Sequence, residues 1–318
     1  MKKKLAKFMS MIMIAALIVT GFTGFTGNTK AYAAEGDTPL LIATAEAPSE
    51  ATVYVTISNK GDLVVRQQSV TVMDIDDDGA LTVSDALYCA HEKYYKGGAA
   101  EGYGAEVGQW GLGVTKLWGD TSGNFGYYVN DIMSMGAGDP INDGDYLNAW
   151  VYSKFSYDFE TGETDADAYS FFNTRKLGIK IGQEKTIRLY YVSGFDASYA
   201  QINSPLKNAV ITIGGEPTEY GTSKKGGFKF SATKSGSYFI SAFSEDVTIV
   251  PPTLLIFVQP EKGEVIEVKN KKYTVTKLGT VKTGKKGKVT FSKSANEGKE
   301  APKTVEYAGV TYKVKVVD

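Results

Sequence analysis

Residues 70–95 read VTVMDIDDDGALTVSDALYCAHEKYY, and this stretch decides how the first part of the chain folds. Its beginning alternates β-branched residues, as a strand does. Its end repeats apolar residues at helical spacing, which predicts a helix over residues 84–96. Four aspartates and a glycine separate the two, and like charges this close together repel one another. A bound cation would compensate that repulsion.

The acidic residues have the spacing of a calcium loop of the EF-hand type. Such a loop supplies oxygen ligands from positions 1, 3, 5, 7, 9 and 12, with a backbone carbonyl at position 7 and a glycine at position 6. Counting from the first aspartate places Gly79 at position 6. The predicted Ca²⁺ ligands are Asp74, Asp76, Asp78, the carbonyl of Ala80, Thr82 and Asp85.

Two features separate this loop from a paired EF-hand. Position 12 is aspartate in place of the usual glutamate, and in this the loop resembles the calcium loops of dockerins. The segment before the loop looks like a strand instead of an entering helix. We therefore expect a single strand–loop–helix that holds a structural cation with an affinity of about 10⁻⁴–10⁻³ M. The alternative is an acidic β-turn built on Asp-Asp-Gly.

The N-terminus has the composition of a secretory signal peptide. A basic region, MKKKLAKF, precedes the apolar run MSMIMIAALIVTGF and a small-x-small site at residues 31–33. Gly21 and Gly24 break the apolar stretch, which disfavours an uncleaved transmembrane anchor. Cys89 is the only cysteine, so no disulfide forms within the chain. We expect cleavage after Ala33 and an extracellular protein of a Gram-positive bacterium, secreted or associated with the cell surface.

The remaining chain is expected to be mainly β with one conspicuous helix, because short strands alternate with Gly-rich turns. The expected parts are a linker at 34–49, a calcium-loop module at 50–157, a β-sandwich at 165–260 and a basic β module at 261–318. The acidic segment FETGETDADA reads as a linker or a mobile loop between the first two modules. Residues 35–160 hold 20 Asp/Glu and 6 Lys/Arg, a net charge of −14, whereas residues 261–318 hold 14 Lys and 7 Asp/Glu, a net charge of +7.

Four stretches of the first module form a recognisable set: DALYCAHEKYY, Gln109-Trp110-Gly111, GYYVND and INDGDYLNAWVY. Over residues 50–153 this set resembles the transcobalamin-like C-terminal β-grasp family, whose bacterial members occur in surface proteins of Gram-positive gut bacteria. The resemblance implies a β-grasp-like α+β fold and a capped small-molecule site of the corrinoid type. Asp131 stands where the family has glycine. The sequence predicts no counterpart to the large helical domain that completes the site in transcobalamin-type binders.

Two longer stretches characterise the later modules. AVITIGGEPTEYGTSKKGGFKFSATKSGSYFISAF is similar to the prealbumin-like or Ig-like pattern. The pair KKYTVTKL and APKTVEYAGVTYKVKVV is similar to a short β module at the ends of clostridial surface proteins. Likenesses of this kind imply an Ig-like β-sandwich and a small β module, and they imply little chemistry.

The residue inventory disfavours an enzyme. His91 is the only histidine, so a Ser-His-Asp triad has no other base, and its place within the helix favours a packed imidazole. Glycine spacings fit neither a dinucleotide site nor a phosphate loop. A carboxylate pair for glycoside hydrolysis stays open. We expect a non-enzymatic protein without a nucleic-acid partner.

Aromatic residues gather in the first module, which holds all three tryptophans. One interpretation is packing in the core or on the sheet face, which we expect for Trp150 and Tyr127. The other is a ligand face of Trp110, Trp118 and Tyr128 at the Gly-rich loop of residues 97–124. Such a face would stack on a flat ligand or a glycan.

Two functions fit these observations. The first is a surface-associated modular protein that presents the calcium-stabilised β-grasp domain for adhesion or for binding a host or surface ligand. Its basic residues 261–318 would rest on an anionic cell-wall polymer by charge attraction. The second is a corrinoid-like small-molecule binder, as the resemblance implies. We favour the first, because the helical domain that would complete the corrinoid site is not predicted.

Overall fold

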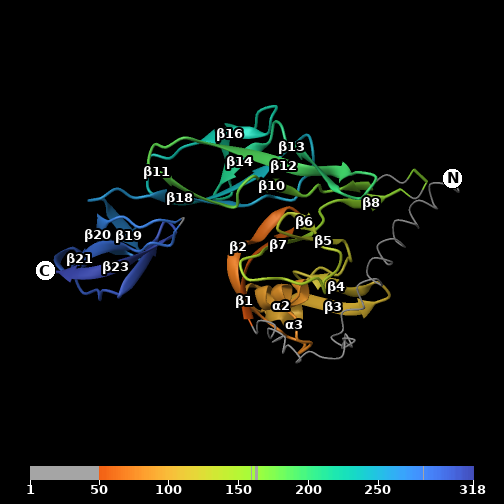
Figure 1. Cartoon of the computed structure of the whole chain (residues 1–318), viewed down its shortest axis with the longest axis horizontal. Helices are drawn as coiled ribbons and strands as arrows, with labels where there is room; N and C mark the ends of the chain where they lie inside the picture. The colour runs from red at the N-terminus through yellow and green to blue at the C-terminus, as the bar shows by residue number, and fades with distance from the viewer. Residues whose placement is uncertain (1–49, 159, 162–163, 282) are drawn as a thin grey trace, which may run out of the picture. The chain divides into compact units, whose positions relative to one another are not determined.

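The computed structural model describes residues 50–318 except 159, 162, 163 and 282 (Figure 1). The expected signal peptide and the linker at residues 34–49 lie outside the described residues. The described chain is mainly β, as expected, and forms two compact units whose boundary falls between Asp167 and Ala168. The first unit has one buried apolar core, and the second unit has two.

The first unit is built on a five-stranded mixed sheet. In sheet order its strands are β2 (Asp62–Met73), β1 (Glu50–Asn59), β7 (Tyr146–Val151), β5 (Phe125–Val129) and β6 (Ile132–Met133). β1 and β7 run parallel at the centre, and the other neighbours are antiparallel. Lys60 and Gly61 join β1 to β2 with φ values of 52° and 91°, and positive φ at both positions is what a tight two-residue hairpin turn requires. A central parallel pair with hairpins on both sides is the β-grasp arrangement.

Helix α2 (Val83–Tyr94) lies in the connection between the parallel strands, which cannot be joined by a tight turn. Its buried Val83, Leu87 and Ala90 share one core with Val53 and Val55 of β1. These positions alternate along the strand and recur every three to four residues along the helix, so each element has one apolar side. Burying a valine or leucine completely contributes about 1.5–3 kcal/mol. The helix begins one residue before, and ends two residues before, the predicted bounds.

Residues 97–124 do not form one long loop, as the sequence had suggested. They contain a short helix, α3 (Gly98–Gly102), and an antiparallel hairpin of β3 (Tyr103–Gly108) and β4 (Gly111–Leu117). Glycine is depleted in strands, so the glycines at 104, 108, 111 and 113 concealed this hairpin. Two glycines of this segment, Gly97 before α3 and Gly111 at the start of β4, have φ values of 98° and 99° that disfavour other residues.

The acidic segment expected as a linker also takes part in regular structure. β8 (Phe155–Tyr157) pairs with β9 (Thr164–Ala166) in an antiparallel hairpin. Buried Asp167 closes it, because its carboxylate accepts hydrogen bonds from the N–H and hydroxyl of Ser153 at 2.6 and 2.8 Å and from the N–H of Lys154 at 3.2 Å. One of the polar residues that suggested a linker, Asp167, thus stabilises the end of the first unit.

The second unit begins with a β-sandwich. One sheet contains β10 (Ser170–Phe172), β12 (Lys185–Phe195), β13 (Gln201–Pro205) and β16 (Gly227–Phe230). The other has the order β11 (Lys176–Lys180), β18 (Leu254–Gln259), β17 (Gly236–Phe243), β14 (Val210–Ile213) and β15 (Glu216–Gly221). Side chains from both sheets, such as Leu189 and Ile256, meet in one core. A core shared between two sheets defines a sandwich.

The second unit ends in a short module of one five-stranded sheet, with a separate core around Tyr273, Phe291 and Tyr312. Its order is β19 (Val265–Val268), β20 (Lys271–Lys277), β21 (Gly287–Ser292), β23 (Val310–Val317) and β22 (Thr304–Tyr307), with the 3-10 turn η1 (Ser294–Asn296) after β21. The side-chain amide of Gln259 donates to the carbonyl of Ala308 at 2.8 Å. The small sheet is therefore joined to the sandwich by direct contacts.

Candidate functional site

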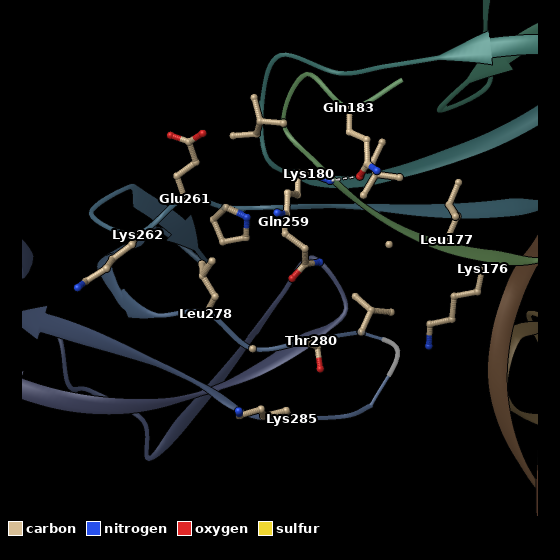
Figure 2. A pocket seen from close by; sticks show the side chains of 16 residues that line it. Lys176, Leu177, Lys180, Gln183, Gln259, Glu261, Lys262, Leu278, Thr280 and Lys285 are labelled. Carbon is tan, nitrogen blue, oxygen red and sulfur yellow. Dashed lines mark hydrogen bonds between the residues drawn. The ribbon is translucent and has the colours of Figure 1, made fainter. Parts of the chain in front are cut away.

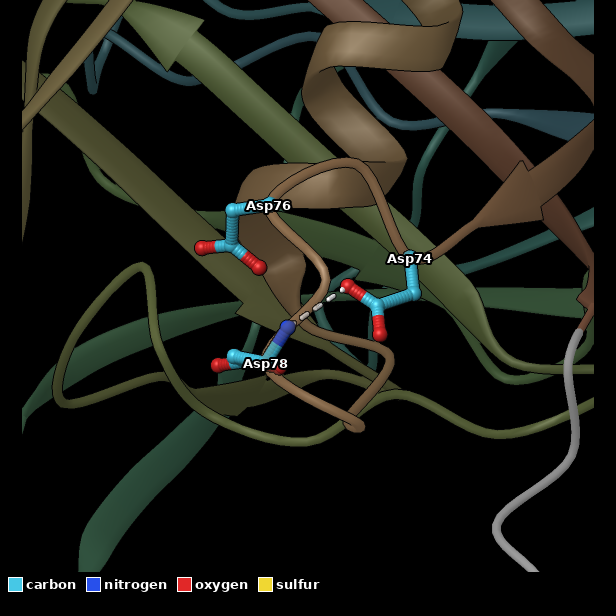
Figure 3. Close-up of side chains that lie close together, drawn as sticks. All are labelled: Asp74, Asp76 and Asp78. Atoms are coloured by element: carbon cyan, nitrogen blue, oxygen red, sulfur yellow. Dashed lines mark hydrogen bonds between the residues drawn. The ribbon is translucent and has the colours of Figure 1, made fainter.

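The acidic loop connects β2 to α2 and gathers three carboxylates at one point. One carboxylate oxygen from each of Asp74, Asp76 and Asp78 lies within 4.8 Å of the others (Figure 3). Gly79 has a φ of 85°, so the glycine at position 6 makes the turn that the loop pattern requires. β2 runs to Met73, which confirms that a strand and not a helix enters the loop. Oxygen ligands in this arrangement suit a hard cation such as Ca²⁺.

Hydrogen bonds within the loop hold two of these carboxylates in place. Asp74 Oδ1 accepts the N–H of Asp78 at 3.2 Å, and Asp74 Oδ2 accepts the N–H of Gly79 at 2.8 Å. Asp78 Oδ1 accepts the N–H of Ala80 at 2.8 Å. Each bond shapes the backbone around the carboxylates, and among the described residues no lysine or arginine forms an ion pair with any of the three aspartates.

The electrostatics of the cluster favour adding positive charge. A slight loss of hydration at this exposed side chain, followed by the nearby charges of Asp78 and Asp85, raises the pKa of Asp76 above the usual value for aspartate. A raised pKa means that the ionised carboxylate is disfavoured where it stands. A divalent cation would reverse that balance, because it supplies the opposite charge at the point where the carboxylates meet.

Two other predicted ligands, Thr82 and Asp85, cap the N-terminus of α2 in this structure. Thr82 is the N-cap of α2, and its side chain and that of Asp85 form a reciprocal capping box. Asp85 Oδ2 accepts the Thr82 N–H at 2.8 Å and the Thr82 hydroxyl at 2.7 Å, while Oδ1 accepts the N–H of Ile75 at 3.1 Å. Both residues are buried and lie outside the group of three carboxylates. The spacing Thr-x-x-Asp before an apolar run was the sequence signal for this cap.

His91 is fully buried and has both ring nitrogens occupied. Nδ1 lies 2.7 Å from the carbonyl of Leu87 and therefore donates to it, while Nε2 accepts the backbone N–H of Trp118 at 3.0 Å. These partners fix the neutral tautomer with its proton on Nδ1. Burial lowers the pKa of the imidazole to about 4. The expectation of a packed imidazole is confirmed.

The structure does not bring the three proposed ligand-face aromatics together. Trp110 lies at the tip of the β3–β4 hairpin, with 54% of its surface exposed. Trp118 is half-buried, and its ring lies 5.2 Å from that of His91. Tyr128 is buried with its ring 5.5 Å from that of Trp150, so its assignment to an exposed face is wrong, whereas Trp150 is buried as expected. Tyr127 and Val129, the neighbours of Tyr128 on β5, pack against the core that contains α2. Successive side chains of a strand point to opposite faces, so Tyr128 points to the other face of the sheet.

Lysines line up across the exposed face of the small C-terminal sheet. Lys277 on β20 pairs in register with Lys288 on β21, which pairs in register with Lys313 on β23. Neighbouring strands lie about 4.8 Å apart. All three side chains are exposed and form no ion pair with a described residue, and Lys315 lies two positions further along the same face. We call Lys277, Lys288 and Lys313 the lysine row. Like charges directly opposite one another destabilise a sheet, so the row attracts anions.

Comparison with known proteins adds little to this description. No family model matches the chain, and no curated protein matches it. Among solved structures, the chain is similar to one described as the D0-D1 domain of Intimin, with 14% identity, coverage of 64% of this chain and 97% of that chain, and a TM-score of 0.23. That score is too low to support a shared fold. Within the described residues, no helix is long and apolar enough to span a membrane.

Proposed function

We propose that the protein is an exported, non-enzymatic surface protein whose basic C-terminal sheet attaches to an anionic cell-wall polymer. The lysine row is the observation on which this proposal depends. A sheet face that places three ammonium groups side by side is stabilised when an anion lies across it, because the like-charge repulsion is then offset. A linear polyanion offers repeated charges along one direction, and the lysine row does the same across three strands.

A calcium-stabilised β-grasp domain is the second element of this proposal. Cation binding at Asp74, Asp76 and Asp78 would fix the loop immediately before the N-terminus of α2, whose side chains form much of the core. Calcium outside the cell would therefore stabilise the domain that the protein presents. No observation favours the alternative of a corrinoid-like site, since the aromatic residues proposed for a ligand face are not assembled.

The attachment test compares two variants that change the same charge. The first carries Lys277→Gln, Lys288→Gln and Lys313→Gln, which removes the lysine row. The control carries three Lys→Gln changes at exposed positions of the same module outside the row, Lys269, Lys286 and Lys303. Cosedimentation of the purified full chain with Gram-positive cell walls measures the attachment at low and at physiological salt.

We expect the row variant to lose most of its cosedimentation and the control variant to keep it. Added salt should release the wild type, because exposed charges are screened beyond about 8 Å at physiological ionic strength. Equal loss in both variants would mean that net charge alone governs attachment. Full retention of the row variant at low and at physiological salt would refute the proposal. Circular dichroism of both variants establishes that each is folded.

A further inference from the structure

A groove within the second unit lies where the sandwich meets the basic C-terminal sheet. Its volume is about 970 Å³, and it is lined by residues 176–181 of β11 and its extension, by residues 259–262 and by residues of the turn between β20 and β21 (Figure 2). This volume is at the upper end of the range for ligand pockets. No residue of the lysine row lines the groove, so it is a separate site.

The groove faces the outer side of β11. Ile179 lies in the sandwich core, so alternation turns its neighbours Gly178 and Lys180 to the outer side of the sheet. Val281 of the β20–β21 turn lies over Gly178, because a Cβ at that glycine would be 3.3 Å from the Cβ of Val281. Val281 itself packs against the core of the C-terminal sheet. The turn and the outer face of β11 therefore form two walls that meet at this contact.

The polar groups of these walls largely bind to one another. Beside β11 the N–H of Lys180 donates to the side chain of Gln183 at 3.0 Å, which is the dashed line in Figure 2. In the turn the N–H of Thr280 donates to the carbonyl of Lys285 at 2.9 Å. Gln259 Nε2 donates to a backbone carbonyl at 2.8 Å, and its Oε1 has no partner among the described residues but is buried. A ligand rich in N–H and O–H groups would lose its bonds to water here and find few partners.

The walls offer apolar surface instead. Ile181, Pro260, Leu278 and Val281 contribute apolar side chains to the lining. Leu278 keeps 43% of its surface exposed, although leucine is among the residues most often buried. The stems of the lysines in the lining add methylene groups, because a lysine covers apolar surface with its stem while its charged end stays in water. The groove therefore suits an apolar chain.

The charged ends of four lysines surround this apolar surface. Lys176, Lys180, Lys262 and Lys285 are exposed and lie around the groove in Figure 2, and Glu261 is the single acid of the lining. None of these lysines forms an ion pair with a described residue. Charge complementarity gives specificity and speeds association, so these lysines select a ligand that carries negative charge.

We propose that this groove binds a single amphipathic anion, a long-chain carboxylate, with its apolar chain between the walls and its carboxylate among the lysines. A methylene group occupies about the volume of a water molecule, roughly 30 Å³, so a twelve-carbon chain takes roughly 360 Å³ and fits the groove. The anion enters as a monomer, because the apolar residues line a recess and do not form the projecting apolar face that inserts into a membrane. The proposal does not depend on attachment through the lysine row, because the two sites use different residues.

The test titrates the full chain with three amphiphiles, each below the concentration at which it forms micelles. Dodecanoate has the proposed chain and charge. Dodecyltrimethylammonium keeps the chain and reverses the charge, whereas butyrate keeps the charge and shortens the chain. Isothermal titration calorimetry measures affinity and stoichiometry. Cosedimentation with vesicles that contain an anionic lipid tests whether the protein binds a membrane surface instead.

The first pair of variants tests the apolar walls. Leu278→Glu places a carboxylate in the groove, whereas Val265→Glu makes the same change of charge at a residue of β19 that is 59% exposed and lies outside the lining. We expect Leu278→Glu to weaken dodecanoate binding at least about tenfold, because the new charge would lose water to the apolar chain and would repel the ligand's carboxylate. Val265→Glu should leave the affinity unchanged.

The second pair of variants tests the lysines. Changing Lys180→Gln and Lys285→Gln together should weaken dodecanoate binding about tenfold. Changing Lys224→Gln and Lys225→Gln in an exposed turn of the same sandwich removes the same charge outside the lining and should not weaken it. Circular dichroism of all four variants establishes that each is folded.

We expect dodecanoate to bind with one molecule per chain, and dodecyltrimethylammonium and butyrate to bind at least about tenfold more weakly. Equal binding of the two twelve-carbon compounds would show apolar contact without selection for charge and would overturn the proposal. Equal effects of the two glutamate variants would place the binding outside the groove and would also overturn it. So would an absence of dodecanoate binding, and binding to vesicles alone would then assign the lysines to a membrane surface.

Discussion

Acidification should destabilise the first unit through His91. The folded protein holds this imidazole neutral, because Nδ1 donates to the carbonyl of Leu87 and Nε2 accepts the N–H of Trp118. Protonation would place a buried charge in the core and would turn Nε2 into a donor that faces another donor. Trp118 would then lose the partner of its backbone N–H, at a position whose φ of 51° is already in the left-handed region.

The size of the effect follows from the two pKa values of the imidazole. Burial lowers the pKa from 6.5 to about 4 in the folded protein, so the unfolded chain binds the extra proton between these pH values. The stability is therefore complete above pH 6.5 and is lost as the pH falls toward 4. One pKa unit corresponds to 1.36 kcal/mol, so the full loss is about 3 kcal/mol and the loss at pH 5 is about 2 kcal/mol.

Urea unfolding from pH 8 to pH 4.5 measures this dependence, and a His91→Gln variant is the control. Glutamine offers both a donor and an acceptor but does not titrate, so the variant should be nearly independent of pH between 5 and 7. The chain has a single histidine, so its imidazole signal in an NMR titration is assigned without ambiguity. A midpoint near 6.5 in the folded protein, or an equal pH dependence in the variant, would refute the reasoning.

Three further predictions concern the first unit. Trp118→Ala should lower the free energy of unfolding by about 3 kcal/mol, because its ring packs on the helix, whereas Trp110→Ala at the exposed hairpin tip should change it by less than about 0.5 kcal/mol; urea titrations distinguish these outcomes. Calcium at 100-fold excess over its dissociation constant should add about 2.7 kcal/mol, a gain that Asp76→Asn removes and Asp77→Asn preserves; thermal melts with calcium and with a chelator would contradict this if both variants behaved alike. Gly126→Ala should cost about 1–3 kcal/mol, because a Cβ there would lie 2.2 Å from the tryptophan ring on β7, and an unchanged melting midpoint would show that this ring can move aside.

The spacing of apolar residues in the sequence predicted the strand and the helix that each bury one apolar side. Alternation along β1 and helical spacing along α2 gave the main elements of the first unit, since each follows from a single apolar side. The β3–β4 hairpin was not predicted, because its glycines are uncommon in strands. The two strands form because they pair with each other, and the local sequence does not show that pairing. Asp85 illustrates a different ambiguity, because the same carboxylate fits position 12 of a calcium loop and the N3 position of a capping box.

The lysine row could not be predicted, because it depends on the register between strands. Lys288 and Lys313 are in register only because β21 and β23 run parallel with one particular alignment. A shift of one residue would turn every side chain of one strand to the opposite face. The sequence shows only that residues 261–318 are basic, and it does not show that three of their lysines form a row.

The parallel pair at the centre of the β-grasp domain also determines how the domain responds to mechanical force. β1 lies at the beginning of this domain and β7 near its end, and six residue pairs from Tyr54–Tyr146 to Asn59–Val151 align them side by side. Tension that enters at residue 50 and leaves at residue 151 pulls these two parallel strands in opposite directions along their length. The hydrogen bonds between them are then sheared together, and they do not separate one after another as in a hairpin pulled from its open end. The lifetime of a domain under force is set by its unfolding rate, so this geometry would extend the lifetime of the domain under tension.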